Sequence, residues 1–125
     1  MKPQTHSHKR LAIPASGECP DFGTVVRLAL NCALLGMQVC VMCFSQEVLD
    51  KWAGYSHPAL SGIMLLDVLD CNRATLSDWK QLLRAHRLDL LVLHGATAEL
   101  QSKRLAVRYV TALVDAASAD MVVLA

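Results

Sequence analysis

Short apolar runs alternate along this chain with longer segments in which apolar residues recur at helical spacing. Such alternation is typical of βα units, whose parallel strands are buried on both faces by the helices that connect them. The pattern predicts strands over residues 11–15, 38–44, 62–66, 88–93 and 120–125. We therefore expect an α/β fold with a mostly parallel, five-stranded sheet.

Helices are expected between these runs, and several local signals support them. Pro20 suits the first turn of the first helix, and Gly36 is typical of its C-terminal end. Thr75 and Asp78 resemble a capping box at the start of the third helix. The predicted helices cover residues 21–35, 45–53, a segment beginning at Thr75, and a long segment within 98–117. The first is apolar around most of its circumference, so we expect it to be covered on two sides.

Composition indicates one domain with more apolar residues than its interior can bury. The chain has 125 residues, of which 54% are hydrophobic and 18% charged. A domain this small has a limited interior, and surplus apolar surface usually enters subunit contacts. We expect a flexible tail over residues 1–9, a single domain over 10–125, and a homo-oligomer.

Charge and hydropathy argue against two classes of partner. The formal net charge is +1, and no basic block exceeds two residues, which is too little to attract nucleic acid. The longest apolar stretch, residues 28–44, is interrupted by polar residues and glycine, so no membrane span is expected. The polar N-terminus lacks the apolar core of a secretory signal, which favours a cytoplasmic location.

Ligands of open parallel sheets bind beyond the carboxyl ends of the strands. That rule selects the loops at residues 16–19, 45–47, 67–73 and 94–97. Ser16, Gly17, His94 and Gly95 are therefore candidate binding residues. An imidazole at this edge could act as an acid, a base or a hydrogen-bond donor near neutral pH. The alternative is an ordinary solvated loop histidine.

Two loop cysteines are candidate nucleophiles. Cys19 directly precedes a predicted helix, whose N-terminus favours a thiolate. Cys71 lies between Asp70 and Arg73, which act on the thiol pKa in opposite directions. The alternative for both is an unreactive loop thiol.

The other three cysteines are expected to serve as small core residues. Cys40 and Cys43 form a C-x-x-C pair inside a predicted strand, where residues three apart point to opposite faces and cannot readily share a metal ion. Cys32 lies in the apolar first helix. No metal-ligand spacing, Walker A motif or G-x-G-x-x-G sequence is present, so neither a metal nor a cofactor is expected.

Three segments resemble the DsrE/DsrF-like sulfur-relay family. Residues 22–44, FGTVVRLALNCALLGMQVCVMCF, contain Ala33, Gly36, Met37 and Val39 in an arrangement similar to the peroxiredoxin-like branch. Residues 76–93 and 109–125 extend the resemblance over most of the chain. It implies a three-layer α/β/α domain, a trimer or hexamer, and a persulfide on a cysteine after the fourth strand. That sulfur would pass to a sulfur-relay partner without a cofactor.

The chain departs from this family at the relay cysteine. Leu93 or His94 occupies the corresponding position, and no cysteine lies between Asp89 and Ser102. Sulfur trafficking would therefore depend on one of the two loop cysteines. The alternative is a non-catalytic assembly subunit that binds a small ligand or partner at the same edge. A third hypothesis is a universal-stress-like nucleotide-binding domain, but only Gly95 remains of the glycine-rich stretch it requires.

Overall fold

The computed structural model describes residues 10–12, 21–69 and 72–125. Strands and helices alternate along the chain, as the apolar pattern predicts. The strands are β1 (Arg10–Ala12), β2 (Val39–Cys43), β3 (Ile63–Asp67), β4 (Leu90–His94) and β5 (Met121–Leu124). The helices are α1 (Phe22–Leu34), α2 (Gln46–Ala53), α3 (Arg73–Arg84), α4 (Ala96–Gln101) and α5 (Val107–Ala117), with a 3-10 turn, η1 (Pro58–Gly62).

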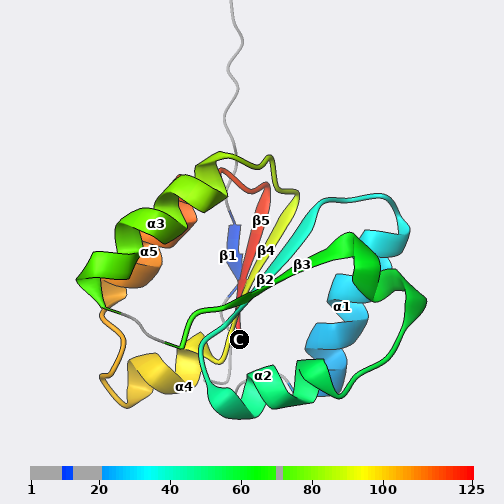
Figure 1. The fold of residues 1–125 in the computed structure, drawn as a ribbon, viewed down its shortest axis with the longest axis horizontal. Coiled ribbons are helices and arrows are strands. Elements are labelled where there is room, and N and C mark those ends of the chain that lie inside the picture. The colour runs from blue at the N-terminus through cyan, green and yellow to red at the C-terminus, as the bar shows by residue number, and fades with distance from the viewer. Residues whose placement is uncertain (1–9, 13–20, 70–71) are drawn as a thin grey trace, which may run out of the picture.

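Every strand pair described is parallel, and the order across the sheet is β1-β5-β4-β2-β3 (Figure 1). The body of the sheet consists of four strands, β5, β4, β2 and β3. The three-residue β1 joins this body beside β5, where a longer strand over residues 11–15 was expected; residues 13–15 lie outside the described part. The predicted α/β class and parallel sheet are confirmed.

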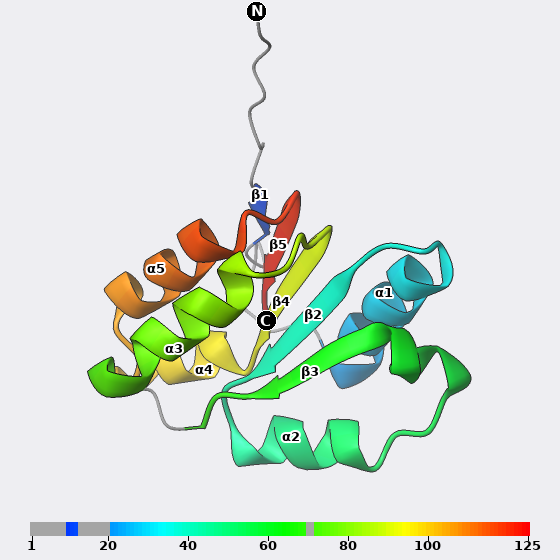
Figure 2. The same ribbon diagram turned by 45° about the horizontal axis from the view of Figure 1, so that its top comes forward.

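Helices cover both faces of the sheet, which makes three layers (Figures 1 and 2). Side chains alternate along each strand, so one buried set packs beneath α3 and α5 and the other beneath α1 and α2. The central strands β2 and β4 are buried at every position. This two-sided burial explains why their sequences are continuously apolar rather than alternating.

Two helix boundaries differ from the predictions. The expected long helix within 98–117 is two helices, because the chain turns after α4 through Lys103, whose φ is +63°, and buries Leu105 before α5 begins. Asn72, rather than Thr75, caps α3: its side-chain oxygen accepts a hydrogen bond from the Thr75 amide at 3.1 Å.

The outer surface of α1 is left partly apolar. Leu34 is 66% exposed and Leu35 is 79% exposed, so within the described chain the helix is covered on one side and not on two. The proposed tail, residues 1–9, lies outside the described residues. None of the described helices is long and apolar enough to cross a lipid bilayer.

Candidate functional site

A pocket of about 280 Å³ opens at the carboxyl edge of the sheet. Three turns form it: the start of α1, the β2–α2 turn and the β4–α4 turn. This is the edge at which parallel sheets bind ligands. The lining residues are Asp21, Phe22, Ser45, Glu47, Val48, Lys51, His94, Gly95, Ala98 and Ala125.

Two of these turns pack closely against each other. Ser45 caps α2, its Oγ accepting a hydrogen bond from the Val48 amide at 3.2 Å. Gly95 follows β4 with φ at +89°, a conformation that side-chain-bearing residues rarely adopt. A Cβ atom at Gly95 would lie 3.2 Å from Ser45 Oγ and 3.3 Å from Ser45 N. Glycine is therefore required both by the backbone and by the neighbouring turn.

His94 ends β4 and is the buried polar group of the pocket, with 5% of its surface exposed. Its Nδ1 accepts a hydrogen bond from Nε1 of Trp52 at 2.9 Å. An indole nitrogen can only donate, so Nδ1 of the neutral ring carries no proton and Nε2 does. The bond with Trp52 thus fixes both the orientation of the ring and its tautomer.

Aromatic packing keeps this imidazole neutral. The Phe22 ring stacks on it, with ring centroids 5.9 Å apart and an interplanar angle of 13°. Trp52 packs edge-on, with a centroid distance of 6.1 Å. Burial lowers the pKa of His94 from 6.5 to about 4, and the positive charge of Lys51 adds to this effect. At neutral pH, His94 is therefore a fixed hydrogen-bond donor through Nε2 and not a cation.

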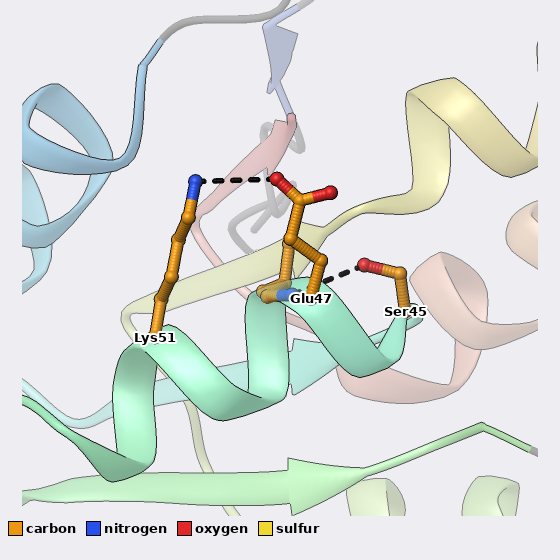
Figure 3. A network of polar contacts seen from close by, with 4 residues as sticks. Ser45, Glu47 and Lys51 are labelled. Atoms are coloured by element: carbon orange, nitrogen blue, oxygen red, sulfur yellow. Dashed lines mark hydrogen bonds and ion pairs between the residues drawn. The ribbon is translucent and has the colours of Figure 1, made fainter.

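The charged residues of the pocket nearly balance. Lys51 Nζ lies 3.3 Å from Glu47 Oε1 (Figure 3). Glu47 is in the first turn of α2, beside Ser45, and Lys51 is in its last turn. Asp21 caps α1, accepting a hydrogen bond from the Thr24 amide at 2.7 Å. Hydrogen bonds from the Thr24 side chain and from this amide lower the Asp21 pKa. Two carboxylates thus face one ammonium group and the positive ends of two helices.

The structure brings together two of the predicted site residues, His94 and Gly95. The predicted solvated alternative for His94 is wrong, because aromatic rings bury it. The other four predicted residues, Ser16, Gly17, Cys19 and Cys71, lie outside the described residues.

Sequence reasoning missed Phe22 and Trp52. Both lie on amphipathic helices, where an aromatic residue reads as an ordinary core side chain, and no local signal connects Trp52 to a histidine 42 positions away. Ser45 lies in the 45–47 loop that the strand-end rule selected, and it does line the pocket. Asp21 was expected only as the start of the first helix.

The cysteines of the described region are poor nucleophiles. Cys32, Cys40 and Cys43 are buried free thiols. Burial raises the pKa of Cys40 to about 12 and that of Cys43 to about 11. Cys40 packs in the core beneath α3 and α5, and Cys43 in the core beneath α1 and α2. The prediction that this pair points to opposite faces is confirmed.

Within residues 10–12, 21–69 and 72–125, no three His, Cys, Asp or Glu side chains gather as metal ligands would. Comparison of the chain with protein-family models, with curated proteins and with solved structures found no match. The geometry of the pocket is therefore the basis for interpreting the site.

Proposed function

We propose that this protein binds a small, uncharged ligand carrying a carbonyl or similar acceptor group, at the His94 pocket. The observation that supports the proposal is His94 itself. Its ring is buried, neutral and fixed by Trp52, and its Nε2–H has no hydrogen-bond partner among the described residues. His94 lines the pocket, so an acceptor group on a ligand bound there would bond this N–H.

The balance of charge favours an uncharged ligand. Asp21 and Glu47 each contribute one negative charge and Lys51 one positive charge. The N-termini of α1 and α2 add roughly half a positive charge each. The sum is close to zero, so neither a polyanion nor a cation gains much from this pocket. A nucleotide triphosphate is disfavoured on the same ground, which ranks the universal-stress-like alternative last.

Size and lining favour a ligand with an apolar body. The pocket, at about 280 Å³, lies at the small end of the range for ligand sites. Phe22, Val48 and Ala98 contribute apolar surface to its lining. The preferred ligand is therefore small, with one acceptor directed at Nε2 of His94 and a hydrocarbon portion against these side chains.

Ligand-detected NMR on the full chain tests this proposal. The probes are cyclohexanone and N-methylacetamide, with acetate and methylammonium as charged comparisons. We expect the neutral carbonyl compounds to bind best, and His94→Gln to weaken them by about tenfold, the value of one hydrogen bond. His86→Gln is the matched control, because His86 is exposed on the far side of the sheet from this pocket, directly after α3.

A second variant guards against a folding defect. Ala98 is exposed and lines the pocket, so Ala98→Leu should fill the space without disturbing the core. We expect it to abolish binding while the circular dichroism spectrum stays unchanged. Absence of binding by the wild-type chain, or equal affinity in the Ala98→Leu variant, would contradict the proposal.

Sulfur trafficking of the DsrE-like kind is the second candidate function. The observation that favours it is the place of Asp21 in the pocket. Cys19 lies outside the described residues and is two positions before Asp21 in the sequence. Under this candidate function, a persulfide on Cys19 would be delivered at the His94 pocket. Cys71 remains the other candidate acceptor.

The chemistry needs no cofactor. A cysteine thiolate attacks the terminal sulfur of a donor persulfide, R–S–S–H. A new S–S bond forms on the protein as the donor S–S bond breaks, the proton stays on the transferred sulfur, and the donor leaves as the thiolate R–S⁻. Loading the chain with glutathione persulfide and measuring the intact mass tests this step. We expect one added sulfur, lost in Cys19→Ser or Cys71→Ser; no added sulfur would refute it.

The remaining elements of the proposal concern assembly and location. We propose a homo-oligomer. A trimer or hexamer that hands sulfur to a relay partner, as the DsrE-like resemblance implies, belongs to the second candidate function alone. We further propose a cytoplasmic location.

A further inference from the structure

Strand β3 is an exposed sheet edge of unusual composition. Its sequence, Ile63–Asp67, is apolar at every position except the last and contains neither proline nor lysine. Natural proteins generally protect such edges by shortening them or by placing charges and proline on them. Strand β3 carries a single charged residue, Asp67, at its last position.

The hydrogen-bond pattern shows which groups of β3 are open. The Val68 amide donates to the Cys43 carbonyl at 2.9 Å. In a parallel ladder alternate residues bond the same neighbour, so Met64 and Leu66 also direct their backbone groups to β2. The amides and carbonyls of Leu65 and Asp67 therefore face away from the sheet. They have no backbone partner among the described residues.

The side chains at this edge are also partly uncovered. Leu65 is 39% exposed, and Leu69, just beyond the strand, is 39% exposed. Met64 and Leu66 are only half-buried on the other face. In both ribbon views β3 forms the rim of the sheet, between α2 and α3, with no helix across its outer edge (Figures 1 and 2).

We propose that β3 pairs antiparallel with β3 of a second copy of this chain, about a two-fold axis at Leu65. In this register the two Leu65 residues exchange both of their backbone hydrogen bonds across the axis. On either side, the Asp67 amide donates to the Ile63 carbonyl of the other copy. The Ile63 amide is not needed, since it already donates to the Leu60 carbonyl within its own chain.

Side chains and charges are self-complementary in this register. The two Leu65 side chains lie opposite each other on one face and cover their exposed surface. Each Asp67 lies opposite Ile63 of the other copy, so the two carboxylates are four strand positions apart. That separation is about 13 Å, which is beyond the distance at which like charges repel strongly in physiological salt. The result is a continuous sheet through two copies, independent of the ligand pocket.

Analytical ultracentrifugation of the full chain and two matched variants tests the interface. We expect the wild type to sediment with twice the mass of one chain. Leu65→Lys should be monomeric, because it places two ammonium groups opposite each other at the axis. Leu34→Lys makes the same chemical change on exposed α1 and should remain dimeric. Circular dichroism checks that both variants keep the wild-type fold.

Cross-linking supplies a second measurement that does not depend on weakening the interface. Residues opposite each other in a hydrogen-bonded antiparallel pair have Cα atoms about 5.5 Å apart, within disulfide range. Mild oxidation of Leu65→Cys should therefore yield a covalent dimer joined through position 65, identified by peptide mass mapping. Leu34→Cys should yield none. A monomeric or trimeric wild type, or a dimer lost in Leu34→Lys and retained in Leu65→Lys, would overturn the proposal.

Discussion

Lowering the pH should destabilise this protein through His94. The folded-state pKa of His94 is lowered from 6.5 to about 4, so between these values the unfolded chain binds a proton that the folded chain does not. Stability then rises with pH across this interval. The contribution of His94 is fully present above pH 6.5 and is lost as the pH falls towards 4.

The size of the effect follows from the two pKa values. At pH 4.5 the linkage relation gives a loss of about 2.5 kcal/mol relative to pH 7.5. Partial solvent screening at the pocket reduces this to about 2 kcal/mol. Protonation would also place two proton-bearing nitrogens, Trp52 Nε1 and His94 Nδ1, against each other across a 2.9 Å contact.

Urea unfolding followed by circular dichroism at pH 7.5 and pH 4.5 measures this loss. His94→Asn is the comparison, since an amide oxygen can accept from Trp52 and does not titrate. We expect the wild type to lose about 2 kcal/mol more than the variant between these two pH values. Equal losses in the two proteins, or an NMR titration giving His94 a pKa near 6.5, would refute the reasoning.

Three further outcomes are expected. Trp52→Phe should lower the free energy of unfolding in urea by about 2–4 kcal/mol, because it leaves a cavity and an unpaired acceptor on His94. Trp79→Phe, at a half-buried site, should lower it by only about 1 kcal/mol. Equal losses in the two variants would contradict the role of the indole donor. Gly95→Ala should lower the free energy of unfolding, measured by thermal denaturation, by at least about 1 kcal/mol more than Gly36→Ala does. Both glycines have positive φ, but only at Gly95 would the new methyl group contact a neighbouring turn, at Ser45. With both loop cysteines replaced by serine, native protein should not react with Ellman's reagent until urea unfolds it; rapid native reaction would contradict the burial of the remaining thiols.

The local sequence was sufficient for the strands and for most helix ends. Continuous apolar runs predict β2 and β4 because central parallel strands are buried on both faces. Prediction from the local sequence failed where tertiary packing sets the end of a helix. The segment after α4 reads as one helix with α5, but burying Leu105 requires the chain to turn there.

The site divides in the same way. Position in the chain alone placed His94 and Gly95 at the carboxyl edge of the sheet, because a residue that ends a parallel strand must lie there. The tautomer and pKa of His94 could not be predicted from its position in the chain. Its tautomer and lowered pKa depend on Trp52 and Phe22, which reach it from α2 and α1 only after the sheet has folded. The sequence by itself thus determined the edge at which this protein has its pocket, because its apolar periodicity marks where each parallel strand ends. Only the tertiary structure decided the chemistry of that pocket, because burial and hydrogen bonding between distant segments set the protonation of its histidine.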